Sequence, residues 1–542
     1  MGLFDRLFGR HNEDDKRSED SFEVPWDGSP SIYEHIKSHL RPDVPGLSEG
    51  FELLPDEERL ERSSDIRWAA GAMDGILTHH WGGADEENDK KLLKLVQAYW
   101  TTPTLKNKVD LYNLVVKTNV VGIIDQFIKG LAQQESVNHD RLYDLARSFA
   151  TEASDREPVK FGLAILGLYE QPDDLEVFRT LGRHDEFTLF CAVALSNFGD
   201  NGEVELCELA KNVDGWGRIQ TVERLAGTEN ADIKEWMLRE GYKNSIMYEY
   251  LAYTCATSGG LLGALSQETV DQELLTASGE IIEALIMGGP AESIDDYDDG
   301  AIAVDLYLDH IQQHGQNISQ FLAVASIRDF LTNEEADWNT REEHGWSKDK
   351  RTAMKEQCDA IVANPKWNDL AMKGLQSTDD LDFYRADRAA QTLGIDTWKF
   401  HWERLKQSPL DSGRWFHIMR FCHDNRIDQT LELATQRIPL DQISTGPAKE
   451  SGLGLEWQPH SCLDFVLQEL RRFPGKGIEL IEVGLRSPVI RNRNMALKAL
   501  SEWGYDLWPD SVGALLQKAL SDEPDDDVRK WIKKVIAGEA LE

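Results

Sequence analysis

Apolar residues recur every three to four positions along most of this chain, which is the spacing of one face of an α-helix. The clearest instance follows Pro488, which can open a helix because its missing N–H needs no partner there, and ends at Gly504. Its inward-facing positions are Arg493, Ala496, Ala499 and Leu500. The small side chains let a second helix approach closely, so the stretch predicts one helix packed among others.

The same arrangement of residues returns elsewhere in the chain. Near the C terminus, an acidic run after Pro524 precedes a helix with Val528, Ile532 and Val535 on one face. Looser copies contain Val159, Leu163, Leu166 and Gly167; Phe187, Cys191 and residues 194–199; Arg218, Thr221 and Leu225; and Arg385, Ala389, Leu393 and Gly394. The first three copies start roughly thirty residues apart, which is the length of one helical hairpin.

These positions resemble the second helix of a HEAT-like repeat, and Val528 with Arg529 matches the Val-Arg pair of that repeat best. The resemblance covers roughly half of the chain. It implies an all-α fold, an α-solenoid of HEAT-like helical hairpins with irregular insertions, in which each hairpin packs only on its neighbours. No stretch of useful length alternates with the period of two that a strand requires.

Changes in composition predict where the chain divides. Helices are expected within residues 32–40, 66–81, 90–100 and 111–133, with Asp110 as the N-cap of the last of these. The expected regions are a flexible arm (1–30), an N-terminal helical region (31–153), HEAT-like repeats (154–331), a polar linker (332–350) and C-terminal helical repeats (351–542) with an insertion near 440–461.

The charge balance and the cysteines indicate which partners and which cellular compartment to expect. The 542 residues include 58 Lys and Arg against 96 Asp and Glu, a net charge of −38, which disfavours nucleic acid as a partner. The six cysteines contain no CxxC pair, and buried thiols in a reducing cytoplasm are expected. No run approaches the roughly 18 apolar residues of a membrane span. We therefore expect a cytoplasmic protein without a transmembrane segment.

Two short patterns of catalytic proteins occur without the context that they need. Residues 46–50 read GLSEG, but a nucleophile elbow follows a buried strand, and residues 41–45 form a polar stretch bounded by proline. His310 and His314 share a helix face, yet Ile311 stands where a zinc protease has glutamate. A turn explains the first pattern and an ordinary helix surface the second.

Metal and nucleotide signatures are also incomplete. Residues 295–300 are acidic, but Tyr297 and Leu306 occupy ligand positions of a calcium loop. Two pairs, His184 with Glu186 and His401 with Glu403, supply the His-x-acid part of an iron site, and both fall inside or at the edge of helices. The glycines at 215–217 and 452–454 follow no strand, which argues against a dinucleotide site. The sequence thus predicts no metal site and shows no evident cofactor signature.

Two further features, which are less specific than a sequence motif, are candidate binding sites. Trp398, Trp402 and Trp415 cluster in the sequence and would either line an apolar pocket or fill the core between helices. A basic stretch stands out from the acidic chain and would either dock an acidic partner or be neutralised by the chain's own acidic face. Its candidate partner-binding residues are Arg471, Arg472, Lys476, Arg491 and Arg493.

Three functions from different classes remain open. The first is a helical-repeat scaffold that binds a protein or peptide partner. The second follows from a resemblance, since the opening MGLFDRLF, the length and the acidic helical pairs are similar to those of bacterial limonene hydroxylases. That resemblance implies an NAD(P)H-dependent monooxygenase that converts limonene to carveol or perillyl alcohol and oxidises these alcohols further. The third, a HEAT-like DNA-repair glycosylase, is opposed by the net charge.

Overall fold

A computed structural model describes residues 30–41, 45–51, 53–57, 69–79 and 86–541 of the chain. The chain forms two compact units, Met1–Asn364 and Pro365–Glu542. Among the described residues, regular structure is helical apart from two isolated β-bridges, Leu40 with Leu47 and Glu450 with Val489. The predicted flexible arm lies outside the described residues except for residue 30.

The first unit contains α1 (Ile32–Ser38), α3 (Ala72–His79), α4 (Glu86–Thr101), α5 (Leu105–Val115), α6 (Val120–Ala132), α7 (His139–Glu152), α8 (Arg156–Leu166), α9 (Leu175–Leu181), α10 (Asp185–Ser196), α11 (Gly202–Lys211), α12 (Gly215–Glu223), α13 (Ala231–Trp236), α14 (Glu249–Gly259), α15 (Leu261–Leu265), α16 (Gln272–Met287), α17 (Gly300–His314), α18 (Ile318–Thr332), α19 (Trp338–Glu343) and α20 (Lys348–Val362). Short 3₁₀ turns lie at Pro172–Asp174 and Gly199–Asn201, and a π-helical turn, Met237–Gly241, continues α13.

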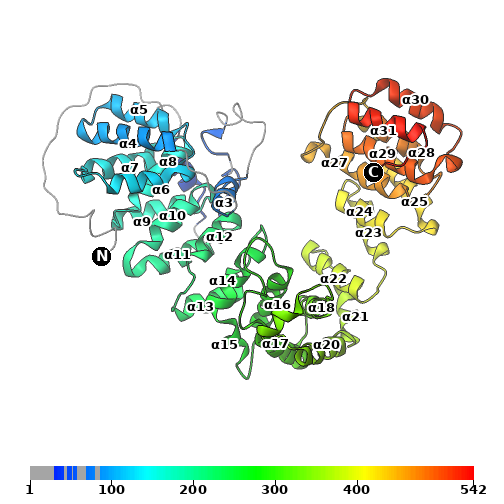
Figure 1. Cartoon of the computed structure of the whole chain (residues 1–542), viewed down its shortest axis with the longest axis horizontal. Coiled ribbons are helices and arrows are strands. Elements are labelled where there is room, and N and C mark those ends of the chain that lie inside the picture. The colour runs from blue at the N-terminus through cyan, green and yellow to red at the C-terminus, as the bar shows by residue number, and fades with distance from the viewer. Residues whose placement is uncertain (1–29, 42–44, 52, 58–68, 80–85, 542) are drawn as a thin grey trace. The chain divides into compact units, whose positions relative to one another are not determined.

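A ladder of helices runs through this unit (Figure 1). α8 packs on α10, and α12, α14, α16, α18 and α20 follow in the same manner, each against the one before it. α7, α9, α11, α13 and α17 flank these helices. The repeated residues of the sequence pattern lie on the ladder, since Val159, Leu163, Phe187, Cys191 and Thr221 are all buried. The chain is thus an all-α solenoid, as the periodicity predicts.

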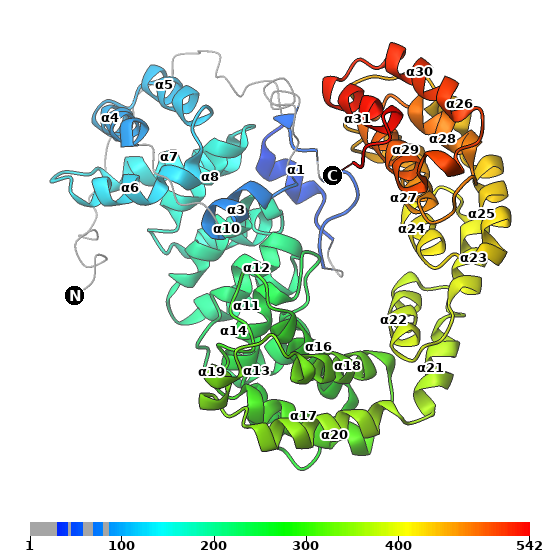
Figure 2. The ribbon, with the colours of Figure 1, turned by 45° about the vertical axis from the view of Figure 1, so that its right-hand side comes forward.

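The second unit repeats the scheme with α21 (Lys366–Gly374), α22 (Asp380–Thr392), α23 (Trp398–Gln407), α24 (Ser412–Arg420), α25 (Asp424–Arg437), α26 (Leu440–Ile443), α27 (Gln458–Leu470), α28 (Ile478–Leu485), α29 (Ile490–Trp503), α30 (Val512–Asp522) and α31 (Asp526–Ile536), and with 3₁₀ turns at Leu455–Trp457 and Tyr505–Leu507. Here α24, α27, α29 and α31 pack in succession, as Figure 2 shows in yellow to red. Ala496, Ala499 and Leu500 of α29 are buried, as their spacing predicts.

Three boundaries differ from the prediction. Pro488 lies outside α29, because Val489 is the N-cap and the helix begins at Ile490. The single helix expected over residues 111–133 is two helices, because the Asn119 side chain accepts the N–H of Gly122 and starts α6 there. Asp110, the expected N-cap, lies within α5, whose N-cap is Thr104, and Asn119 caps α6.

The polar run at 332–350 belongs to the first unit, whose boundary falls after Asn364. Its sequence is hydrophilic, yet Trp346 is buried and its ring lies 5.0 Å from that of Phe330. Arg341 also donates two hydrogen bonds, of 2.6 and 2.8 Å, to Asp295. These contacts join the run to α18 and to the loop before α17, and its role as a linker stays a prediction.

Irregular backbone occupies part of the expected insertion near 440–461, between α26 and α27. It is held by a hydrogen bond from Gly446 N to Arg486 O of 2.9 Å and by the bridge between Glu450 and Val489. Leu453 and Leu455 remain 78% and 87% exposed. Within the described part of the chain, no helix combines the length and apolarity needed to cross a bilayer.

Candidate functional sites

A cavity of about 570 Å³ lies in the first unit, where the N-termini of α10 and α12 come together. Its lining combines backbone, apolar and charged groups: Gly46, Leu47, Phe51, Leu54, Glu57, Ala69, Ala70, Arg156, Arg183, His184, Asp185, Glu186, Asn212, Val213, Asp214, Gly215 and Ser245. Residues from several successive repeats therefore meet in one concave site.

Two glycines of α12 let the Asp185 carboxylate approach the N-terminus of that helix. A Cβ on Gly215 would lie 3.2 Å from Asp185 Oδ2, and one on Gly217 would lie 2.7 Å from Asp185 Oδ1. Gly215 also has a φ of +53°, which side chains disfavour. The Gly-Trp-Gly sequence at 215–217 thus leaves room for the Asp185 carboxylate at the start of α12.

The cavity carries two acidic groups without a direct ion pair to a described residue, although Arg218 interacts electrostatically with Asp214. Burial raises the pKa of Asp185 to about 7, the negative charge of Asp214 adds to the rise, and the N–H of Gly217 opposes it. Asp214 is exposed, and its Oδ1 accepts the N–H of Ser245 at 2.9 Å. Neither carboxylate forms an ion pair with any residue that the structure describes. A positive charge entering the cavity would stabilise both in their ionised forms.

The basic groups at the cavity differ in the hydrogen bonds and ion pairs that they form. Arg156 donates two hydrogen bonds of 3.0 Å to Asp56 and one of 2.9 Å to Glu57. Arg183 donates to the backbone oxygen of Arg41 at 3.4 Å. Burial lowers the pKa of His184 to about 4, so its imidazole is neutral at physiological pH. Arg156 is paired with carboxylates, so the charges at the cavity that form no ion pair with a described residue are those of Arg183, Asp185 and Asp214.

A buried ionic cluster supports the wall behind these groups. Lys160 of α8 is 3% exposed and lies 2.8 Å from Asp74 of α3 and 2.7 Å from Glu186 of α10. Burial opposes the charge on Lys160, but Glu186, Glu157 and Asp74 outweigh it and raise its pKa. The cluster fastens three helices together beneath the cavity.

Exposed apolar side chains lie beside the cavity. Ile246 and Met247, which directly follow the lining residue Ser245, are 44% and 36% exposed. A Cβ placed on Gly215 would lie 3.9 Å from Ile246 Cδ1, so this side chain reaches the edge of the acidic site. The cavity therefore has exposed apolar area next to its acidic groups.

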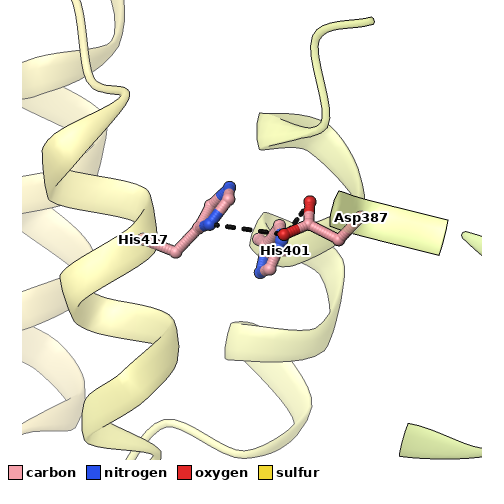
Figure 3. A group of neighbouring side chains, drawn as sticks. All are labelled: Asp387, His401 and His417. Carbon is pink, nitrogen blue, oxygen red and sulfur yellow. Dashed lines mark ion pairs between the residues drawn. The ribbon is translucent and has the colours of Figure 1, made fainter. Parts of the chain in front are cut away.

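A second candidate site lies in the second unit, where Asp387 of α22, His401 of α23 and His417 of α24 converge (Figure 3). His401 Nε2 lies 2.9 Å from Asp387 Oδ1, and His417 Nδ1 lies 3.7 Å from Asp387 Oδ2. The two imidazole rings stack with centroids 3.4 Å apart. Three consecutive helices therefore present a carboxylate and two imidazoles to one point.

The protonation of this group follows from its surroundings. Burial lowers the pKa of His417 to about 4, and the neighbouring His401 contributes to the decrease. Burial disfavours the charge of Asp387, but interactions with His401, Thr397 and His417 outweigh it and hold its pKa below the ordinary value. At neutral pH the group thus offers an ionised carboxylate and a neutral His417 imidazole, both in the form that binds metals.

The sequence pointed to His401 with the wrong carboxylate. Glu403, the acid of the His-x-acid pair, turns to Lys406, whose Nζ lies 2.7 Å away. Asp387 comes from the preceding helix and His417 from the following one, so no short motif joins the three. In the other pair, His184 Nδ1 accepts the N–H of Glu186 while the Glu186 carboxylate binds Lys160.

The five predicted partner-binding residues do not form one free basic surface. Arg493 is buried, and it donates hydrogen bonds of 2.8 and 3.0 Å to both oxygens of Glu523. Arg491 contacts Asp464, Lys476 lies 2.7 Å from Asp428, and Arg472 donates to backbone oxygens of Met419, Arg420 and Cys422 and pairs with Glu469. Arg471 is half exposed, 3.9 Å from Glu469. The chain's own acids neutralise much of this stretch.

The predicted tryptophan cluster lies in the core of the second unit. Trp398 is 6% exposed and donates to Ile418 O at 3.2 Å, and Trp415 is fully buried and donates to Pro409 O at 2.7 Å. Trp402 is partly buried and stacks on Trp398 with centroids 4.9 Å apart. Their positions are those of core packing between α23 and α24.

The remaining sequence candidates have structural partners. His310 Nε2 lies 2.9 Å from Leu265 O, and His314 is the last residue of α17. In the acidic loop, Asp295 binds Arg341. Gly46 and Gly50 both have positive φ, consistent with the turn expected at GLSEG. All six cysteines are free and buried, as their isolated positions predict.

Comparison with known proteins adds little to this picture. No protein-family model matches the chain, and no curated protein matches it. Among solved structures, a circular tandem repeat protein with novel repeat topology and enhanced subunit contact surfaces is similar over 86% of this chain and 95% of its own, at 14% identity and a TM-score of 0.13. A score this low carries no argument. The helical-repeat assignment rests on the helices described above, and membership of the HEAT class stays a prediction.

Proposed function

We propose that this protein is a helical-repeat scaffold that binds a protein or peptide partner, and that the cavity at Asp185 and Asp214 receives a basic side chain of that partner. The observation that carries the proposal is the pair of carboxylates in a concave site, neither of which forms an ion pair with a described residue. A Lys or Arg side chain or an N-terminal amine of the partner would form a direct ion pair with these carboxylates.

Two features support a protein segment as the ligand. The exposed Ile246 and Met247 at the rim provide apolar contact area for residues beside the basic one. The net charge of −38 attracts basic partners over a long range and speeds their association. Solenoids also present such sites on extended surfaces made by several repeats.

A pair of matched variants tests the proposal. A fluorescent peptide with one arginine among apolar residues is titrated into the full chain, and its anisotropy is recorded. Replacing both cavity acids (Asp185→Asn with Asp214→Asn) should weaken binding by about tenfold or more, because a charge-assisted contact contributes about 1.5–3 kcal/mol. The same titration with a lysine-free, arginine-free peptide should show no comparable affinity.

The control must change the net charge equally without touching the cavity. Asp173 and Asp232 are exposed acids of the same unit, and neither lines the cavity. The variant Asp173→Asn with Asp232→Asn should retain the affinity of the unmodified protein. Equal weakening by both double variants would mean that the peptide senses overall charge, and the proposed site would be wrong.

The limonene hydroxylase alternative stays a prediction from the opening residues. One observation bears on it, since Asp387, His401 and His417 are the residue types of the two-histidine, one-carboxylate iron sites of oxygenases. Limonene-dependent oxidation of NAD(P)H by the iron-loaded chain, with formation of carveol or perillyl alcohol, would establish it. Oxidation that is independent of limonene would remove it.

A further inference from the structure

We propose that Asp387, His401 and His417 bind one divalent transition-metal ion, for which Zn²⁺ is the representative, and that this ion ties α22, α23 and α24 together. The inference is independent of the partner cavity, which lies in the other unit. It concerns three side chains whose ligand atoms all lie within 4.8 Å of one another.

The donor atoms suit such an ion. Two imidazole nitrogens and one carboxylate oxygen are a common set for Zn²⁺, and the same set binds Fe²⁺. Hard ions such as Ca²⁺ and Mg²⁺ prefer oxygen ligands only, so they fit this set poorly. Three protein ligands also leave a further coordination position for water or another donor.

The distances fit with small side-chain rotations. Zinc lies about 2.0–2.1 Å from nitrogen and oxygen ligands, so two ligands of one tetrahedral ion are roughly 3.4 Å apart. The measured separations from Asp387 are 2.9 Å to His401 Nε2 and 3.7 Å to His417 Nδ1, on either side of that value. The two imidazole rings are stacked only 16° from parallel, so they would rotate about their side-chain bonds to direct both nitrogens at one ion.

Neighbouring side chains orient two of the ligands. Thr397 Oγ1 lies 3.2 Å from His417 Nε2, which turns the other nitrogen, Nδ1, towards Asp387. Gln391 donates a hydrogen bond of 2.8 Å to Asp387 Oδ2. Outer partners of this kind fix the imidazole tautomer and the carboxylate orientation in metal sites.

A second observation points to a ligand at this place. His401 is 7% exposed, and neither of its ring nitrogens makes a hydrogen bond with a described residue. Its Nε2 is close to Asp387 Oδ1, but the pair is not aligned as a hydrogen bond, and that oxygen also lacks a partner. Buried polar atoms are normally satisfied, and a cation between these two would satisfy both.

Metal titration of the full chain tests the site. The protein is stripped with a chelator and titrated with Zn²⁺ by calorimetry, with Fe²⁺ (anaerobically), Mn²⁺, Co²⁺ and Ni²⁺ in parallel. We expect one Zn²⁺ to bind per chain. The variants Asp387→Asn and His401→Gln should lose at least the 10–100-fold in affinity that outer partners alone contribute. His423→Gln, a change at an exposed histidine of the same unit, should bind as the unmodified chain does.

Folding defects are separated from ligand loss by two further measurements. Circular dichroism reports whether each variant keeps its helices, and Thr397→Val leaves all three ligands in place. Co²⁺ bound to the unmodified chain should give visible absorption bands that shift in Thr397→Val and disappear in Asp387→Asn. Unchanged zinc affinity in a folded Asp387→Asn variant, or failure of all five ions to bind the unmodified chain, would overturn the proposal.

Discussion

Lys160 Nζ lies 2.7 Å from Glu186 Oε1, and both side chains are buried between α8 and α10. Charges taken out of water are tolerated only with close partners, and Asp74 and Glu157 complete the set around Lys160. The cluster therefore supports the cavity structurally. Its removal should lower the free energy of unfolding of the first unit.

Replacing the buried cation (Lys160→Met) should destabilise the first unit by about 3–5 kcal/mol, because three carboxylates lose their counter-charge in the interior. Native-state hydrogen exchange of the α8 and α10 amides measures the free energy of opening. The control is Lys211→Met, since Lys211 is 40% exposed and pairs with Glu208 on the surface of α11. We expect about 0.5 kcal/mol or less there, and equal effects would contradict the account.

Arg493→Met should unfold the second unit more easily by about 3–5 kcal/mol, because it leaves Glu523 buried and unpaired. Arg493 also donates to Ala448 O at 2.7 Å, so amides near residue 448 should exchange faster in this variant. Arg486→Met is the matched control, since Arg486 and its partner Glu482 are both 49% exposed. If Arg493→Met were as stable as Arg486→Met, the buried pair of Arg493 and Glu523 would not stabilise the core.

Asn119→Ala should cost about 0.5–2 kcal/mol in the stability of α6, because the Gly122 N–H loses its cap. Asp110→Ala, which changes an exposed position within α5, should stay within about 0.5 kcal/mol. Thermal unfolding of the two variants side by side distinguishes them. A larger loss of stability in Asp110→Ala than in Asn119→Ala would contradict this assignment and support the single helix, capped by Asp110, that the sequence predicts.

The raised pKa of Asp185, about 7, predicts the pH dependence of the first unit. The folded state holds a proton on this carboxyl that the unfolded chain, with a pKa of about 3.9, releases earlier. The contribution of Asp185 to stability is therefore lost as pH rises from about 4 to about 7. Asp185→Asn keeps the shape without titrating, so unfolding at pH 8 should need more urea than in the unmodified chain, and at pH 4 the two should agree. A constant difference across this range would contradict the assignment.

The fold was predictable because it follows from local periodicity. Each ladder helix shows small or apolar residues on one face, as with Ala496 and Leu500, and this pattern is visible without knowing what packs against it. Helix limits were less predictable, since the choice between Asp110 and Asn119 as a cap depends on the side chain that reaches a free N–H. Trp346 lies within the hydrophilic run at 332–350, so its sequence neighbours did not predict its burial. That burial depends on Phe330, which precedes the run.

The candidate sites were much less predictable, because they join residues from different helices. Asp185 and Asp214 start successive repeats, and only stacking brings them to one cavity. His401 was visible as a candidate, but its acidic neighbour Asp387 lies on the preceding helix, α22. Arg493 looked like a surface cation because its burial partner, Glu523, is remote in sequence.

Hydrogen exchange of the full chain with and without a saturating arginine-containing peptide tests the central claim most directly. If the partner's basic side chain enters the cavity, amides at 215–218 and 245–247 should become protected, and this protection should disappear in the variant carrying Asp185→Asn and Asp214→Asn. Amides of α29 in the other unit should exchange as before. Protection spread over the acidic surface, or unchanged by that variant, would contradict the account.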